Sequence, residues 1–258
     1  MRFGICTNVG NAPAMQAVGW DYVEENVQSR LQGMQDDAQW TGQEEIARSP
    51  LPVLAANCLL PGNLKVTGPE VDPDALRRYM TNVIRRAGQA GIRRLVFGSG
   101  AARAVPAGYD PSAAREQILD FLRMSAPLAA QSGVIVVIEP LNRRECNIIN
   151  TIAEAMRYVL AVDHPSIACL VDTYHLWLEE EPVDHIRQAA KAIQHVHVAD
   201  REGRVPPGKS GQSDYRPIFK ELKAIGYDGL TSVEANFPQI AEQSWEVLRF
   251  LRREWDEA

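Results

Sequence analysis

The sequence predicts a closed barrel of eight parallel β-strands surrounded by helices, a (β/α)₈ fold. Short apolar runs of strand length alternate with longer amphipathic segments along the chain, and these runs number eight. No two-residue hairpin dipeptide joins one run to the next, so each connection must cross over through a helix and the strands must pair in parallel. Eight such units favour a closed barrel over an open doubly wound sheet, which is the remaining alternative.

The size and charge of the chain limit its organisation and its partners. A chain of 258 residues, 45% of them hydrophobic, can bury one large core, and α/β barrels commonly reach this length as a single domain. We therefore expect one TIM-barrel domain over residues 1–258. The net charge of −6 and the scattered Lys and Arg residues argue against a nucleic-acid partner, which needs a basic face. A small molecule is the expected partner.

The cysteines and the apolar segments indicate a cytoplasmic protein. The four cysteines are far apart and form no CxxC pair, which fits reduced thiols. The first residues run straight into a strand-like segment without a signal-peptide pattern, and no apolar run is long enough to span a membrane. We expect a cytoplasmic location and no membrane contact.

The N-terminal half contains four predicted strands, at residues 3–8, 20–24, 53–60 and 95–98. A short helix is expected over 12–18, whereas the polar stretch 26–43 is weakly periodic and is assigned to no element. Asp72 is a capping residue before a proline and starts a helix over 73–90, which has one apolar face and ends at Gly91. Glu24 and Glu25 end the second strand; either they reach a site or they are solvated loop carboxylates.

The C-terminal half repeats the pattern. Asp110 precedes a helix over 111–131, and Ser132-Gly133 ends it. The remaining strands are predicted at 134–138, 167–172, 193–198 and 229–234, and the remaining helices at 151–161, 181–192, 214–225 and 239–255. The apolar side of the last helix would pack on the barrel or on a second subunit, which leaves a homo-oligomer, a dimer or tetramer, open.

The fifth strand ends on a carboxylate that needs an explanation. Its β-branched apolar residues are typical of a strand buried on both faces, and Glu139 follows directly. A free charge there would be costly, so Glu139 must be paired, protonated or bound to a metal. Strands six, seven and eight end in the same way on Asp172, His197 and Glu234. In a barrel, chemistry is carried at these C-terminal strand ends.

These four residues form a plausible ligand set for one divalent ion. Because successive side chains in a strand alternate between faces, each would top an inward row of mostly apolar or small residues, and His195 shares the row of His197. Two Glu, one Asp and one His suit Mn²⁺, Mg²⁺ or Co²⁺ better than a thiol-rich zinc site. Three carboxylates without a cation would repel one another. Taken singly, each residue could be a solvated or hydrogen-bonded one.

Four segments carry a resemblance to a known family. They are Ile138-Glu139-Pro140-Leu141-Asn142-Arg143-Arg144-Glu145, Asp172-Thr173-Tyr174-His175, His195-Val196-His197 and Ser232-Val233-Glu234. They resemble the sugar isomerase/epimerase superfamily of xylose-isomerase-like barrels, and most closely the ketose 3-epimerases of the D-tagatose 3-epimerase type. The specific part of the resemblance covers residues 134–236.

The resemblance implies roles for individual residues. Glu139, Asp172, His197 and Glu234 would bind one divalent metal ion, most readily Mn²⁺. Glu139 and Glu234 would also form the catalytic acid/base pair. The resemblance implies that Glu145 and His175 contact substrate hydroxyl groups.

An arginine in the loop after strand seven completes the implied substrate contacts. By its distance from Gly208 it is Arg204, but the loop before it is one residue longer than in the epimerases, and Arg201 is a rival. The same loop matches the phosphate-loop pattern GxxxxGK[ST] over residues 203–210. We reject a nucleotide site, because Pro206 and Pro207 have no backbone N–H to offer a phosphate.

The residues themselves fit proton transfer next to a carbonyl. Such a reaction needs a base, an acid and a group that holds the enediolate oxygens. Two carboxylates on opposite sides of a sugar can invert a centre, and one carboxylate that carries the proton between adjacent carbons gives an isomer. We predict a metal-dependent epimerase or isomerase of a ketose or related sugar, phosphorylated or not, with no organic cofactor.

Other functions remain open on the same barrel. A metal-dependent dehydratase or a hydroxypyruvate-type isomerase would keep the metal and change the step. An apurinic-site endonuclease would need many more His and acidic ligands on the early strands and a basic face, and neither is seen. A non-enzymatic binding barrel is the fourth alternative.

Overall fold

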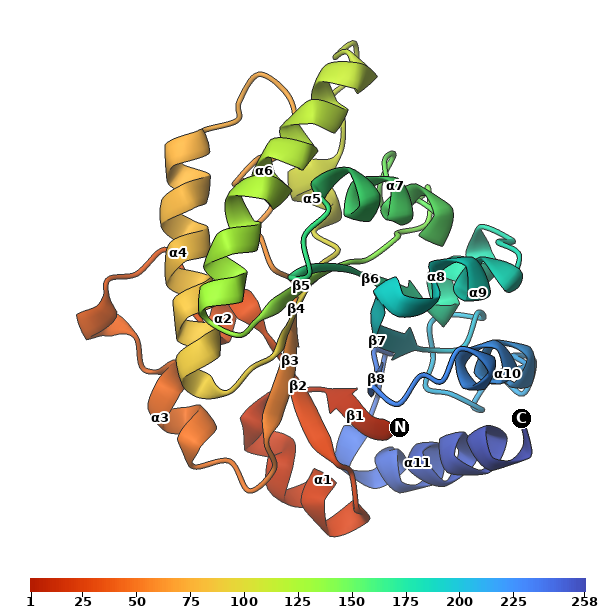
Figure 1. Cartoon of the computed structure of the whole chain (residues 1–258). Coiled ribbons are helices and arrows are strands. Elements are labelled where there is room, and N and C mark those ends of the chain that lie inside the picture. Colours follow the sequence, from red (N-terminus) through yellow and green to blue (C-terminus); the bar gives the residue numbers. More distant parts are fainter.

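Eight parallel strands close into a barrel, with helices around the outside (Figure 1). The computed structural model describes residues 1–258. The strands are Arg2–Cys6 (β1), Tyr22–Asn26 (β2), Val53–Asn57 (β3), Arg94–Phe97 (β4), Ile135–Ile138 (β5), Ile167–Asp172 (β6), Ile193–Val198 (β7) and Leu230–Val233 (β8). Each strand pairs in parallel with the next, and β8 pairs with β1. The predicted fold class is confirmed.

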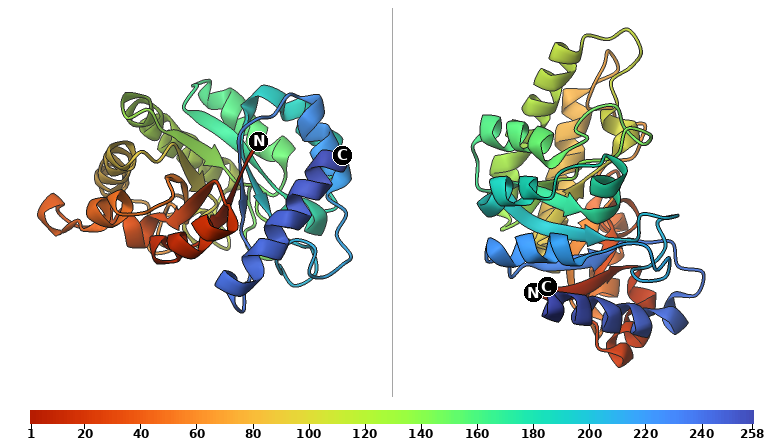
Figure 2. Two further views of the ribbon diagram at one scale, coloured as in Figure 1. Left: turned by 90° about the horizontal axis from the view of Figure 1, so that it is seen from below. Right: turned by 90° about the vertical axis from the view of Figure 1, so that its right-hand side faces the viewer.

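The helices connect the strands in order. They are Ala12–Val18 (α1), Val27–Arg30 (α2), Gly42–Ala47 (α3), Pro73–Ala90 (α4), Gly100–Arg103 (α5), Pro111–Gln131 (α6), Ile152–Val162 (α7), Thr173–Leu178 (α8), Asp184–Ala189 (α9), Arg216–Ala224 (α10) and Ile240–Glu257 (α11). Single 3₁₀ turns lie at Val9–Asn11 (η1), Asp37–Gln39 (η2) and Ala190–Ala192 (η3). The last helix, α11, packs against both α1 and α10 (Figure 2). No helix combines the length and the apolar character that crossing a membrane would require.

The predicted helix starts are confirmed by side-chain caps. The carboxylate of Asp72 accepts hydrogen bonds from the N–H groups of Asp74 and Ala75, and Asp110 caps α6 in the same way. Gly91 ends α4 in the left-handed conformation, as its position predicts. The unassigned stretch 26–43 contains α2, η2 and the start of α3, and neither α5 nor α8 was predicted.

The interior of the barrel is filled by short apolar rows. Ile135 packs with Val96, Val137, Ala168 and Leu170 in one cluster inside the barrel. Tyr22, Ala55 and Leu230 form a second one. The predicted inward rows of β5, β6 and β8 are therefore confirmed. The polar strand-end residues lie at the top of these rows, at the C-terminal ends of the strands.

A buried arginine joins the tops of β4 and β5. Arg103 is fully buried and donates hydrogen bonds to the carbonyl oxygens of Phe97 and Glu139, both at 2.7 Å, and of Ile149 at 3.3 Å. Its guanidinium also lies 5.3 Å from the ring centroid of Phe97. Arg103 thus fixes the backbone from which the Glu139 side chain projects.

Candidate metal centre and active site

The ends of four consecutive strands bring Glu139, Asp172, His197 and Glu234 together. One ligand atom of each residue lies within 4.8 Å of the others. The Nδ1 atom of His197 is 3.0 Å from Glu139 Oε1, 3.4 Å from Glu234 Oε2 and 3.9 Å from Asp172 Oδ2. Three of the four are buried, and Glu234 is partly exposed.

Local structure turns each carboxylate toward this cluster. Asp172 ends β6 and caps α8, because its Oδ1 accepts a hydrogen bond from the N–H of His175 at 3.0 Å, which leaves Oδ2 for the cluster. Gly98 makes room for Glu139: a Cβ atom at position 98 would lie 2.1 Å from Glu139 Oε2. Asn57, at the end of β3, donates to Glu234 Oε1 at 2.7 Å.

The donor set fits a divalent cation. Three carboxylates and one imidazole nitrogen are the hard ligands that Mn²⁺, Mg²⁺ or Co²⁺ accept. Like charges buried this closely repel unless a cation lies between them. The structure therefore contains a candidate site for one divalent metal ion at the mouth of the barrel.

The surroundings of Glu139 and Glu234 shift the pKa values of these two carboxyl groups in opposite directions. The pKa of Glu139 is raised, first by burial and then by the charge of Glu234. Burial would also raise the pKa of Glu234, but His197 and Arg204 outweigh it and lower this pKa to about 2. Burial would lower the pKa of His197, yet Glu24 and Glu234 raise it well above its ordinary value. Without a metal, the imidazole is therefore held as a cation among the carboxylates.

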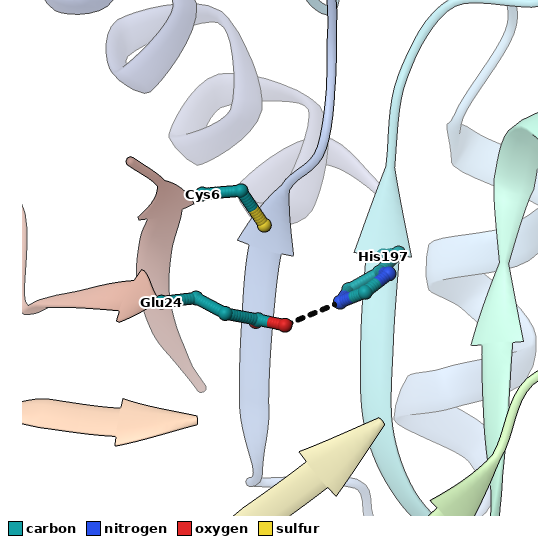
Figure 3. Close-up of side chains that lie close together, drawn as sticks. All are labelled: Cys6, Glu24 and His197. Atoms are coloured by element: carbon teal, nitrogen blue, oxygen red, sulfur yellow. Dashed lines mark hydrogen bonds and ion pairs between the residues drawn. The ribbon is translucent and has the colours of Figure 1, made fainter. Parts of the chain in front are cut away.

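Glu24 belongs to this site, although the sequence left its place open. It lies on β2 and is 1% exposed. Its carboxylate accepts a hydrogen bond from His195 Nε2 at 2.8 Å and another from His197 Nε2 at 2.9 Å; Figure 3 shows the second. Glu25 is equally buried but points elsewhere, accepting from the N–H of Val9 and pairing with Arg30. Successive side chains of a strand point to opposite faces, so Glu24 points into the barrel with Tyr22, whereas Glu25 points the other way. This alternation is the sequence signal that distinguishes the two glutamates.

Two predicted substrate contacts meet at one amide. His175 is 1% exposed, and its Nδ1 lies 2.8 Å from the side-chain nitrogen of Asn142. The same nitrogen donates to Glu145 Oε1 at 2.9 Å. The Nε2 atom of His175 is buried without a partner in the protein. Asn142 lies inside the segment that carries the resemblance, but no role was predicted for it.

Arg204, and not its rival Arg201, reaches the cluster. The guanidinium of Arg204 pairs with Glu234 and lies 3.9 Å from Asp172 Oδ2 and 3.7 Å from Glu145 Oε2. It also stacks over the ring of Tyr174, 4.9 Å from its centroid. Arg201 is exposed.

The loop after β7 has no nucleotide-binding helix. Asp200 is buried and organises it, accepting from the N–H groups of Gly208 and Ser210 and from the Tyr215 hydroxyl. The residues from 203 to 210 form turns without a helix. The rejection of a phosphate loop is consistent with this path.

A cavity of about 330 Å³ opens beside the cluster. Its lining includes Glu139, Glu145, Arg204 and Glu234. Such a volume lies at the small end of ligand pockets, which measure roughly 300–1,000 Å³. A larger cavity, of about 400 Å³, lies on the outside between α4 and α6 and contains none of the cluster residues. The chemistry places the candidate active site at the smaller cavity.

The family model described as xylose isomerase-like TIM barrel matches residues 13–253. The chain belongs to this family. Among its curated relatives, 3-dehydro-D-guloside 4-epimerase of Escherichia coli (strain K12) is 37% identical over 124 residues, which cover 46% of this chain and 45% of that protein. The resemblance predicted from the four segments is confirmed.

Two further proteins similar to this chain are sugar epimerases. D-psicose 3-epimerase of Ruminiclostridium cellulolyticum (strain ATCC 35319 / DSM 5812 / JCM 6584 / H10) is 28% identical over 177 residues, 67% of this chain and 59% of that protein. The two alignments thus span about half the length of each relative. A crystal structure of a D-psicose 3-epimerase in the presence of D-fructose has a TM-score of 0.85 and 18% identity, covering 99% of both chains. That similarity shows the shared fold.

Proposed function

We propose that this xylose isomerase-like barrel is a divalent-metal-dependent sugar epimerase or isomerase. It would move a proton on a carbon next to the carbonyl of a ketose or related sugar. The single observation that carries the proposal is that Glu139 and Glu234 both approach the His197 Nδ1 atom, at 3.0 and 3.4 Å, beside a sugar-sized cavity. The relatives named above are epimerases acting on a ketose and on a dehydro-glycoside, which supports a sugar with a carbonyl group.

The metal would be held by Glu139, Asp172, His197 and Glu234, with Mn²⁺ as the first candidate. A divalent ion held by these residues would supply the positive charge that a carbonyl oxygen needs as a proton leaves the neighbouring carbon. The protein supplies the geometry, since Asn57, Arg103 and the Asp172 cap each fix one ligand or its backbone.

Glu139 and Glu234 would act as the acid and base. One carboxylate removes the proton from the carbon next to the carbonyl, and the other returns a proton. The environments of the two differ, since burial and Glu234 raise the pKa of Glu139 while His197 and Arg204 lower that of Glu234. When the surroundings move the pKa values of two carboxyl groups apart, the difference indicates which one serves as acid and which as base. If both act on one carbon from different sides the centre inverts.

Three residues, two of which line the cavity, would hold the sugar hydroxyl groups. The Nε2 atom of His175 has no protein partner, the Glu145 carboxylate lines the cavity, and the Arg204 guanidinium stands between Glu145 and Glu234. Polar groups of this kind orient a sugar for proton transfer.

The decisive experiment is solvent exchange with a substrate panel. Purified protein with Mn²⁺ is incubated in deuterated water with free ketohexoses and with a 3-dehydro-glycoside, and products are analysed by NMR. Deuterium at C3 with inversion supports 3-epimerisation, deuterium at C4 supports 4-epimerisation, and deuterium at C1 or C2 supports isomerisation. Glu139→Gln and Glu234→Gln should each abolish exchange while Glu25→Gln retains it. Wild-type protein that binds no divalent ion, or exchanges no proton in any of these sugars, would contradict the proposal.

A further inference from the structure

We infer that Glu24 is a positioning residue that decides which ring nitrogen of His197 faces the metal site. The inference rests on the proposed function, because it concerns a ligand of the proposed metal. Figure 3 shows the carboxylate of Glu24 at one edge of the His197 ring. The other ring nitrogen, Nδ1, faces the carboxylates of Glu139, Asp172 and Glu234.

Both oxygens of Glu24 are committed to imidazoles. Oε2 lies 2.8 Å from His195 Nε2, and Oε1 lies 2.9 Å from His197 Nε2. All three side chains have an exposed fraction of 0%. Two directed bonds, one at each oxygen, prevent the carboxylate from rotating, and full burial shields these bonds from bulk water.

The chemistry of the carboxylate then fixes the proton on His197. An ionised carboxylate accepts hydrogen bonds and donates none, so Nε2 of His197 must carry a hydrogen. In the neutral imidazole that a metal requires, the lone pair is therefore on Nδ1. Nδ1 is the atom that faces Glu139, Asp172 and Glu234. A carboxylate on the far nitrogen also makes the ring a better donor to a metal ion.

His195 holds Glu24 in place from below. It lies two residues before His197 on β7, and the two rings meet edge to face with centroids 4.9 Å apart. Its Nε2 donates to Glu24, and its Nδ1 is buried without a partner. With its hydrogen on Nε2, the ring of His195 leaves a lone pair on Nδ1 without a partner, which costs less than leaving an N–H group without one. His195, which the sequence places in the inward row of His197, thus has a specific partner in Glu24.

A competing arrangement uses the same atoms. Cys6, Glu24 and His197 also each offer one ligand atom within 4.8 Å of the others, which could form a second metal site (Figure 3). That site would need His197 Nε2 and a Glu24 oxygen, both of which are already joined by a hydrogen bond. The hydrogen-bonded geometry therefore favours a positioning role for Glu24 over a ligand role.

Two measurements test the inference. The first is ¹¹³Cd–¹⁵N coupling in ¹⁵N-histidine-labelled protein loaded with ¹¹³Cd²⁺, which identifies the nitrogen bonded to the metal and the nitrogen that carries hydrogen. We expect coupling to Nδ1 of His197 and a hydrogen on Nε2. Coupling to Nε2, or Cd²⁺ bound through Cys6, would overturn the inference without any variant.

The second measurement is Mn²⁺ affinity by calorimetry in Glu24→Gln and Glu24→Asp. Loss of a carboxylate behind a metal-bound histidine typically weakens metal binding about 10- to 100-fold, and we expect Glu24→Gln in this range. Glu24→Asp keeps the charge and should recover part of the loss. Glu25→Gln is the matched control, equally buried on the same strand, and should bind Mn²⁺ as the wild type does.

The outcomes separate this inference from the proposed function. Wild-type affinity in a folded Glu24→Gln protein, checked by circular dichroism, would refute the role of Glu24 and leave the proposed function intact. An equal loss in Glu24→Gln and Glu25→Gln would indicate a general packing effect and also refute it. A wild-type chain that binds neither Mn²⁺ nor Cd²⁺ would refute the proposed function and, with it, the inference.

Discussion

Asn142 holds the imidazole ring of His175 in one tautomer. The backbone N–H of Asn142 lies 3.1 Å from His175 Nδ1, and its side-chain nitrogen lies 2.8 Å from the same atom. A backbone N–H can only donate, so Nδ1 accepts and the hydrogen of the neutral ring is on Nε2. That Nε2–H is buried without a protein partner, and under the proposed function it would donate to an oxygen of a bound sugar.

Asn142→Asp should therefore impair sugar binding while sparing the metal. An aspartate would present a carboxylate to the Nδ1 lone pair and to Glu145, which now accepts from the Asn142 amide at 2.9 Å. Hydrogen bonds to charged groups contribute about 1.5–3 kcal/mol, so we expect kcat/KM to fall roughly 10- to 100-fold. Asn142→Ala should cost less, because the backbone donor remains. Steady-state kinetics and Mn²⁺ calorimetry test this; a change in Mn²⁺ affinity larger than the change in kcat/KM would contradict it.

Arg204→Met should shift the acid limb of the pH–rate profile to higher pH. Burial raises the pKa of Glu234, but His197 and Arg204 lower it to about 2, so removal of Arg204 lets this pKa rise. The ionised form of Glu234 is then lost at a higher pH as the solution is acidified, and activity falls with it. The loss of a charge-assisted contact of about 1.5–3 kcal/mol should also reduce kcat/KM by roughly 10- to 100-fold.

Arg201→Met is the control for that experiment. It removes the same charge from the same loop, but Arg201 is exposed and its side chain forms no ion pair with the cluster. We expect an unchanged pH profile. If both variants shift the acid limb equally, the effect comes from net charge and Arg204 has no specific contact with Glu234.

The sequence predicts the barrel and the strand-end residues because both follow from local patterns. An apolar run that ends on a polar residue identifies a strand and its top, and parallel closure then brings Glu139, Asp172, His197 and Glu234 together. Glu24 and Asn57 could not be assigned in this way, because each acts through a partner more than 170 residues away in the chain. For Glu24, the only local signal is strand alternation, which places it in the inward row of Tyr22 but does not identify the partners that it bonds.

The stretch 26–43 escaped prediction for a similar reason. It has little apolar periodicity, and a side chain from another element holds it: Arg86 on α4 is fully buried and donates to the carbonyl oxygens of Leu31, Gln32 and Gln35. Tertiary hydrogen bonds replace the hydrophobic face that sequence patterns detect.

Metal binding should release protons and weaken as the pH falls. Burial would lower the pKa of His197, but Glu24 and Glu234 raise it. Burial and the charge of Glu234 raise the pKa of Glu139. The metal-free site therefore holds protons that a metal ion must displace. Affinity for Mn²⁺ should rise with pH, by about tenfold per pH unit for each proton released, until His197 loses its proton in the metal-free protein. Calorimetry in buffers of different ionisation enthalpy counts the protons. Binding that is independent of pH between 6 and 8 would contradict the predicted ligand set.

Gly98→Ala should weaken metal binding with little effect on the fold. Gly98 follows β4 with no positive φ, so alanine fits its backbone, but the new Cβ would lie 2.1 Å from Glu139 Oε2 and displace that carboxylate. A displaced carboxylate loses most of its contribution to the binding free energy of the metal ion. We therefore expect Mn²⁺ affinity to fall at least about tenfold, which corresponds to about 1.4 kcal/mol. Thermal unfolding of the metal-free protein should change little.

Gly62→Ala is the matched substitution for Gly98→Ala. Gly62 lines the same cavity, but a Cβ there would meet only the Ala101 methyl group, at 3.0 Å. It should leave Mn²⁺ affinity unchanged and affect KM alone, because it narrows the cavity without touching a ligand. If Gly98→Ala binds Mn²⁺ as tightly as Gly62→Ala does, Glu139 is not a metal ligand, and its role would be confined to proton transfer.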